Sequence, residues 1–271
     1  MVDFEYKNNY NIEDLRQIVS ILRSPGGCPW DREQTHASIR RNLLEEAYEA
    51  AEAIDENSEA HLKEELGDVL LQVMFHADIE AEAGRFDLDD VADGVCRKLI
   101  LRHPHVFGSR DVSGTQEVLT NWEEIKRTEK NQKTVTDTLN AVARSLPSLW
   151  RAEKIQKKAA KAGFDWPDVG YALDKLREEV CEVSQAVADR SNYAEELGDV
   201  LLAAVAVARF MGVDPETALA EGCEKFIRRF AAVEAAAEEA GQALDQISYE
   251  QLKQMYADAK NKTEEKRETA K

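Results

Sequence analysis

The segment EELGDVLL occurs twice in the chain, at residues 64–71 and again at residues 195–202. Each copy follows a second acidic motif, EExxE, which occupies residues 45–49 in the first half and residues 178–182 in the second. The two copies of each motif are therefore separated by nearly the same interval. A third pattern, Lys-x-x-x-Arg, begins at Lys98 and recurs at Lys225 after a slightly shorter interval. Three motifs in the same order, with only a small drift in spacing, predict two tandem copies of one domain.

The composition of the chain favours helices. Ala, Leu, Glu and Lys dominate its 271 residues, whereas Gly (13) and Pro (6) are few. Apolar residues recur at helical spacing from Ile12, and Asn11 can cap that helix. Further helices are expected over residues 38–55, 59–83, 87–103 and 116–130, and Asp214-Pro215 is a strong start signal for a later one. We therefore expect an all-α chain of two four-helix-bundle-like domains.

The polar, unpatterned stretch NQKTVTD marks the expected boundary between these domains. We predict a first helical domain over residues 1–130, a linker over residues 131–137, a second domain over residues 138–262 and a frayed tail over residues 263–271.

Charge and hydropathy exclude several kinds of protein. The net charge of −18 disfavours general binding to nucleic acid, whose phosphates would be repelled. The longest apolar run, Val200 to Ala208, is too short to cross a membrane, and the N-terminus lacks the features of a signal peptide. The four cysteines form no CxxC pair. A reduced, cytoplasmic protein is the simplest interpretation.

The two acidic motifs predict a metal site in each repeat. In the second repeat, Glu179 and Glu182 lie three positions apart and share one helical face with apolar residues, as Glu196 and Asp199 do on the next helix. Carboxylates that converge inside a helix bundle repel one another and are costly to desolvate, so they need protons or a cation. Oxygen-only ligands suit Mg²⁺, with Mn²⁺ as a substitute. The same pattern in the first repeat gives Glu46, Glu49, Glu65 and Asp68.

A lone EExxE in an acidic helical protein is more often a solvated charged face. Its recurrence with a downstream ExxD, on faces that also carry apolar residues, favours the metal site here. A di-iron bundle would use Glu-x-x-His pairs on its metal-binding helices, and the acidic motifs of this chain contain no histidine. The chain has no histidine after His105, and we interpret its five histidines as structural.

Basic and aromatic residues near each acidic pair are candidates for binding an anionic substrate. Lys98 and Arg102, like Lys225 and Arg229, lie four apart on one helical face and can contact phosphates, although an ordinary surface pair explains them equally well. Trp30 and Trp166 precede the carboxylate helices, where packing of the bundle end is the favoured role and stacking on a base is the alternative. The remaining candidates mirror Trp122 and Lys126 of the first repeat: Tyr256 and Lys260.

These motifs together resemble the MazG family of nucleoside triphosphate pyrophosphohydrolases. The resemblance covers nearly the whole chain, through stretches such as CPWDREQTHASIRRNLLEEAYEAAEAID, KEELGDVLLQVMFHADIEAE, KKAAKAGFDWPD and EKFIRRF. Its tandem form is similar to the two-domain bacterial type. The resemblance implies an all-α homodimeric enzyme that hydrolyses NTPs or dNTPs between the α- and β-phosphates, with Mg²⁺ as cofactor.

The resemblance also implies roles for individual residues. The Mg²⁺ ligands would be Glu46, Glu49, Glu65 and Asp68, and in the second repeat Glu179, Glu182, Glu196 and Asp199. As a separate mechanistic hypothesis, the carboxylates that accept a proton would be Glu45 or Glu49 in the first repeat and Glu178 or Glu182 in the second. The resemblance implies that Lys225 and Arg229 face the triphosphate, with Lys98 and Arg102 as their first-repeat equivalents. Position alone adds four further candidates for substrate binding: Trp30, Trp166, Tyr256 and Lys260.

One departure separates the repeats. The segment from Trp30 to Glu46 is longer than the segment from Trp166 to Glu179, so the entrance to the pocket is expected to differ. Two alternatives stay open: a narrower relative that hydrolyses dUTP or dCTP, and a non-enzymatic helical scaffold that binds another protein.

Overall fold

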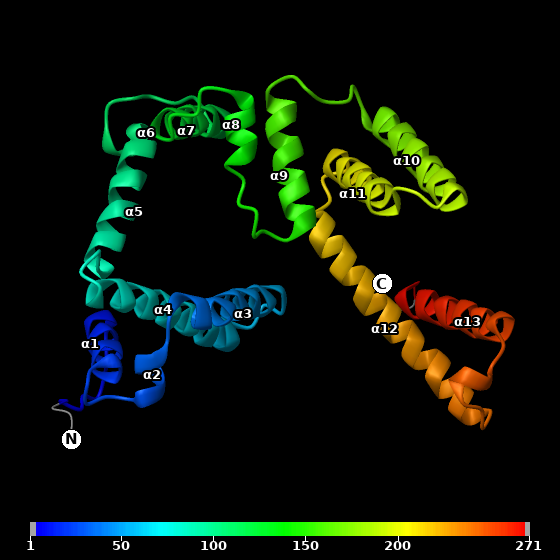
Figure 1. Cartoon of the computed structure of the whole chain (residues 1–271), viewed down its shortest axis with the longest axis horizontal. Helices are drawn as coiled ribbons and strands as arrows, with labels where there is room; N and C mark the ends of the chain where they lie inside the picture. Colours follow the sequence, from blue (N-terminus) through cyan, green and yellow to red (C-terminus); the bar gives the residue numbers. More distant parts are fainter. Residues whose placement is uncertain (1–3, 269–271) are drawn as a thin grey trace. The chain divides into compact units, whose positions relative to one another are not determined.

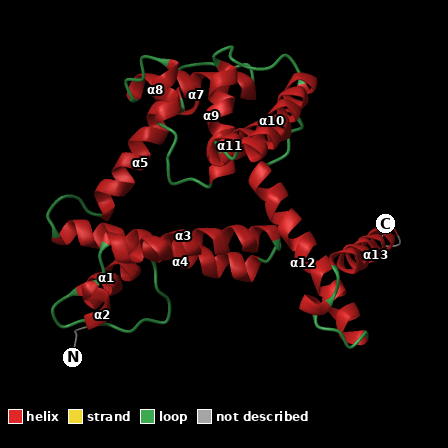
Figure 2. Cartoon of the chain, turned by 45° about the vertical axis from the view of Figure 1, so that its right-hand side comes forward, coloured by secondary structure: helices red, strands yellow, loops and turns green. Residues whose placement is uncertain are grey.

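The computed structural model describes residues 4–268, and within them every regular element is a helix (Figures 1 and 2). The helices in the first half are α1 (Ile12–Arg23), α2 (Pro29–Glu33), α3 (His36–Asp55), α4 (Glu59–Glu82), α5 (Leu88–Arg102), α6 (Pro104–Phe107) and α7 (Thr115–Glu129). Those in the second half are α8 (Val135–Asn140), α9 (Ser148–Lys161), α10 (Val169–Asp189), α11 (Tyr193–Phe210), α12 (Pro215–Glu239), the short 3₁₀ helix η1 (Leu244–Gln246) and α13 (Tyr249–Glu268). The all-α prediction is confirmed.

The chain divides into two compact units, residues 1–126 and residues 127–271. The predicted linker overlaps the start of α8 at Val135, and α13 continues through the predicted tail as far as Glu268. Residues 269–271 of that tail lie outside the described part. Among the described residues, no helix combines the length and apolar character needed to cross a membrane.

The first unit is built around an antiparallel hairpin of α3 and α4, which run side by side in Figure 1. Local signals set its ends: Thr35 caps α3 in a reciprocal capping box, and Ser58 caps α4. Asn57 adopts the left-handed conformation (φ +54°) in the three-residue turn between them. Helix α1 packs against α4 and α2 packs against α1, and the apolar core of the unit comprises Val19, Ile39, Met74 and Phe75.

A buried arginine ties α1, α2 and α4 together. The side chain of Arg23, at the end of α1, is only 2% exposed. It donates to Asp78 Oδ2 (2.9 Å) and Glu82 Oε2 (2.6 Å) on α4, and to the backbone carbonyl of Asp31 on α2 (2.7 Å). The pKa of Asp78 is raised by burial, an effect that Arg23 partly offsets. This arginine therefore neutralises a carboxylate that would otherwise be costly at this position.

The second unit repeats the hairpin with α10 and α11, which are joined by a three-residue turn that contains Arg190 and Asn192 in the left-handed conformation. The buried positions of these helices are small residues such as Ala172, Ala186 and Ala203, which allow close packing. Asp214 caps α12 and Pro215 occupies its first turn, as the sequence predicted.

Two carboxylate clusters as candidate metal centres

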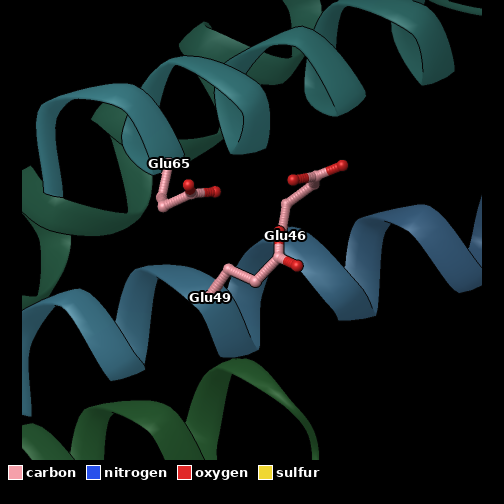
Figure 3. Close-up of side chains that lie close together, drawn as sticks. All are labelled: Glu46, Glu49 and Glu65. Carbon is pink, nitrogen blue, oxygen red and sulfur yellow. The ribbon is translucent and has the colours of Figure 1, made fainter. Parts of the chain in front are cut away.

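The hairpin of the first unit brings three predicted carboxylates together. Glu46 and Glu49 project from α3 and Glu65 from α4 into the space between the helices (Figure 3). Each contributes one oxygen to a group whose members all lie within 4.8 Å of one another. Glu65 is 8% exposed. The fourth predicted ligand, Asp68, lies outside this trio but is close enough to Glu46 to raise the pKa of that carboxyl group.

The second hairpin makes an equivalent cluster from a slightly different selection of residues. Oxygens of Glu179 on α10 and of Glu196 and Asp199 on α11 lie within 4.8 Å of one another. Glu182 lies outside the trio and is more exposed, yet its pKa is raised, first by desolvation and then by its interaction with Glu179. Glu196 lies in the first turn of α11, whereas Glu65 lies almost two turns into α4.

In both clusters, the negative charges of the carboxylates are not fully balanced by nearby positive charges. The pKa values of Glu46, Glu65 and Glu182 are all raised, in each case first by burial and then by neighbouring carboxylates. In the second cluster, Glu179 is 5% exposed, and its buried Oε2 has no hydrogen-bond partner within the described chain. An oxygen-only set with an unsatisfied buried carboxylate oxygen fits a hard divalent cation such as Mg²⁺.

Two basic side chains that were not among the predicted site residues lie against the clusters. Lys175 contacts Glu178 Oε1 (2.9 Å) and Glu179 Oε1 (2.8 Å), and these contacts raise its pKa. In the first unit, His61 Nε2 lies 3.3 Å from Glu65 Oε1. Lys175 precedes Glu179 by four positions, as His61 precedes Glu65, and this helical spacing could have predicted both contacts.

The other predicted proton acceptors lie on the outer flanks of the clusters. The side chain of Glu45 is 53% exposed and lies 3.9 Å from Arg41, and that of Glu178 is 57% exposed and pairs with Lys175. Glu49 and Glu182 are closer to the other carboxylates, because Glu49 belongs to the first trio and Glu182 interacts with Glu179. The geometry therefore favours Glu49 and Glu182 over Glu45 and Glu178 for chemistry at the cluster.

Three of the predicted substrate residues, Arg102, Arg229 and Tyr256, take part in contacts with an aromatic ring. The Arg229 guanidinium on α12 lies 5.9 Å from the ring centroid of Tyr256 on α13. In the first unit, Arg102 and Lys126 lie 5.3 Å and 4.5 Å from the ring centroid of Trp122. A cation–π contact is thus present in both repeats, between Arg102 and Trp122 in the first and between Arg229 and Tyr256 in the second.

The remaining candidates differ in exposure. Lys225 and Lys260 are exposed, Lys98 and Trp166 are half-buried, and Arg102 is buried. Trp30, in α2, is 61% exposed, which does not fit the packing role that the sequence favoured. Within the described chain, Trp30 is therefore available to a ligand or to another protein surface.

The chain is similar to known proteins in both of its halves. It matches the family described as the MazG nucleotide pyrophosphohydrolase domain twice, over residues 34–107 and 171–234, and each match includes one carboxylate cluster. It is 43% identical to the nucleoside triphosphate pyrophosphohydrolase of Escherichia coli (strain K12) over 254 residues, or 92% of this chain and 97% of that protein. It is 44% identical over 248 residues to the nucleoside triphosphate pyrophosphohydrolase/pyrophosphatase MazG of Thermotoga maritima, covering 92% and 95% of the two chains. The Bacillus subtilis (strain 168) protein YabN is 45% identical over 254 residues, covering 93% of this chain and 52% of YabN.

Proposed function

Because this chain belongs to the MazG family and is a nucleoside triphosphate pyrophosphohydrolase, we propose that it is a Mg²⁺-dependent enzyme whose carboxylate clusters are its active sites. It cleaves NTPs or dNTPs between the α- and β-phosphates and releases a nucleoside monophosphate and pyrophosphate. The observation that carries this proposal is the convergence of carboxylates from two helices in each repeat, with one buried oxygen of Glu179 left unpartnered within the described chain. Such an enzyme serves in control of the nucleotide pool. Family membership removes the non-enzymatic scaffold from consideration.

Each cluster supplies both metal ligands and a proton acceptor. The metal would be held by Glu46, Glu49, Glu65 and Asp68 in the first repeat and by Glu179, Glu182, Glu196 and Asp199 in the second. When bound, Mg²⁺ offsets the negative charge of the triphosphate oxygens and lowers the pKa of a coordinated water molecule.

The protein's own side chains perform the remaining tasks of the reaction. Glu182 accepts the proton of the attacking water, because it lies beside Glu179 but outside the trio of converging carboxylates. Lys225 and Arg229 hold the charge of the departing pyrophosphate. Tyr256, against which Arg229 lies, presents an aromatic face beside the phosphate-binding group. Glu49, Lys98, Arg102 and Trp122 would have the same roles in the first repeat.

The proposal is tested by measuring pyrophosphate release from a panel of NTPs and dNTPs with Mg²⁺ or with EDTA. We expect turnover of several bases with Mg²⁺ or Mn²⁺ and none in EDTA. Full activity in EDTA would remove the metal from the mechanism. Turnover confined to dUTP or dCTP would instead identify the narrower relative.

We also propose that the enzyme is a cytoplasmic homodimer. Its four cysteines are free. Large apolar side chains are exposed along α11 and α12, among them Leu197, Leu201, Phe226 and Ile227. Clusters of exposed apolar side chains of this kind are typical of an association surface. Light scattering at several protein concentrations is expected to give twice the mass of the chain.

Metal binding should stabilise the fold more strongly as the pH rises. The folded-state pKa values of Glu46, Glu65 and Glu182 are raised above 4.5. Their contribution to the metal-free fold is therefore present below pH 4.5 and is lost as the pH rises through the raised values. Mg²⁺ binds the deprotonated groups and offsets that loss, by about 2.7 kcal/mol at a hundredfold excess over Kd.

Thermal melts in Mg²⁺ and in EDTA, recorded from pH 4.5 to pH 7.5, measure this effect. We expect nearly equal melting temperatures at the acidic end and a separation of several degrees at pH 7.5. The Asp68→Ala/Asp199→Ala variant is the control and should lose most of the separation. Identical melts of the wild type at pH 7.5 would argue against a metal at either cluster.

A further inference from the structure

A polar seam follows the face of α4 that is turned toward α3 in the first unit. Gln72, His76 and Glu80 are spaced four positions apart in turn and therefore share one helical face. Gln72 and Glu80 are 7% and 8% exposed. Buried polar groups are costly unless they are paired, so a seam of this kind needs an explanation beyond packing.

The second repeat shows that the hairpin does not need polar groups at these positions. When the two copies of EELGDVLL are aligned, Gln72 and His76 correspond to Ala203 and Val207. When the two copies of EExxE are aligned, His36 at the start of α3 corresponds to Val169 at the start of α10. The helices α10 and α11 pack against each other without a histidine at either place. The histidines are therefore a specific property of the first unit.

The rings of His36 and His76 meet edge to edge across the interface between α3 and α4. His36 Nδ1 lies 2.7 Å from His76 Nδ1, and the ring planes are 12° apart with centroids separated by 5.0 Å. The distance between the ring centroids exceeds the distance between the two Nδ1 atoms by nearly twice the radius of an imidazole ring. The two Nδ1 atoms therefore lie on the line that joins the centroids and point at each other. On its other side, His36 Nε2 lies 2.5 Å from Glu80 Oε1.

This geometry allows only one hydrogen between the two Nδ1 atoms. While one ring is neutral, its Nδ1 lone pair accepts the hydrogen of the other ring. When both rings are imidazolium ions, both Nδ1 atoms carry hydrogens and the 2.7 Å contact becomes repulsive. The second proton therefore breaks the contact that joins α3 to α4 at this point.

The charged groups around the pair allow one proton and oppose a second. Glu80 of α4 accepts hydrogen bonds from Arg85 and His36, which lower its pKa to about 2, so it stays ionised and favours the first positive charge. Arg85 adds a fixed positive charge at the same carboxylate, because its Nη2 donates (2.7 Å) to the Glu80 Oε1 that His36 also contacts. On α1, the charge of Arg23 is already paired with Asp78 and Glu82.

We propose that the His36–His76 pair is an acid-sensitive clasp that fixes the start of α3 to α4 at neutral pH and releases it when both rings are protonated. The affected segment begins the helix that carries Glu46 and Glu49. The release is confined to the first unit, because the second has valines at both positions.

The direction of the pH effect follows from His76. Its pKa is lowered from 6.5, first by burial and then by the charge of His36. A histidine whose pKa is lower in the folded state stabilises the fold above its unfolded value, and this stabilisation is lost as the pH falls below that value. The clasp should therefore weaken below about pH 6.5.

Hydrogen exchange on the full-length chain, in the same Mg²⁺ buffer from pH 7.5 to pH 5.0, tests the clasp without any activity measurement. After correction for intrinsic exchange rates, we expect protection at the start of α3 to fall relative to the start of α10. One linked proton gives at most about a tenfold change per pH unit. The His36→Val/His76→Val variant, which has the side chains of the second repeat, should show no such difference between the two helices.

Protection of α3 that parallels that of α10 throughout would overturn the proposal, as would an unchanged pH response in the valine variant. If that variant does not fold, the wild type can be examined alone by NMR of its ring nitrogens. Full protonation of both rings while the α3 amides stay protected would refute the clasp. Neither readout depends on turnover, so the result is independent of the proposed catalytic sites.

Discussion

The double variant Glu65→Gln/Glu179→Gln is expected to release pyrophosphate about 10²–10³-fold more slowly than the wild type, the loss that follows removal of one strong electrostatic contact to a transition state. These are the buried carboxylates of the two clusters, 8% and 5% exposed. Glutamine has nearly the same shape as glutamate, so the substitution removes charge with little change in packing. The rate is measured at saturating Mg²⁺ and NTP.

The control replaces one exposed carboxylate beside each cluster, as Glu64→Gln/Glu195→Gln. These residues precede Glu65 and the first-turn ligand Glu196 in the chain, belong to neither trio and should leave the rate within about twofold of the wild type. The single variants Glu65→Gln and Glu179→Gln then assign the activity to one repeat or to both. Wild-type turnover in the double variant would exclude both clusters as active sites.

Arg23→Ala is expected to destabilise the first unit by about 3–5 kcal/mol, the usual consequence of removing one partner from a buried charge network. The substitution removes hydrogen bonds to Asp78, Glu82 and the Asp31 carbonyl. It also leaves Asp78, whose pKa burial already raises, without its counter-charge. Urea unfolding followed by circular dichroism measures the loss, with each unit allowed its own transition.

Arg16→Ala is the matched control for this experiment, because Arg16 also lies on α1 and also forms ion pairs. Its partners Glu13 and Asp89 are exposed, at 2.5 Å and 3.1 Å. Exposed pairs contribute at most about 1 kcal/mol. If the two variants unfolded at the same urea concentration, the buried ion pairs of Arg23 would contribute no more to stability than the exposed pairs of Arg16.

The helices and the pairing of the acidic motifs were predictable because both depend on local rules. Apolar periodicity and capping residues such as Asn11 and Asp214 locate helix starts, and a spacing of three positions places Glu46 and Glu49 on one face. The internal repeat then indicated that the arrangement occurs twice. These arguments require only the geometry of a single helix.

The details of the clusters were not predictable, because they depend on how two helices are set against each other. Asp68 lies outside the first trio and Glu182 outside the second, although the motifs are the same. The hydrogen bonds of Arg23 span 55 and 59 residues of sequence. The residues His36 and His76, whose rings are in contact, are 40 positions apart in the sequence. The histidines do not have the spacing of metal ligands, so nothing in the sequence indicated this contact.

The position of Glu196 in the first turn of α11 makes the two carboxylate clusters electrostatically unequal. The amide dipoles of a helix add to a partial positive charge at its N-terminus, and this charge favours an ionised carboxylate nearby. Glu65, almost two turns into α4, is too far along its helix for the same benefit. The second cluster therefore combines a helix N-terminus with the ammonium group of Lys175, whereas the only basic side chain described above beside the first cluster is that of His61.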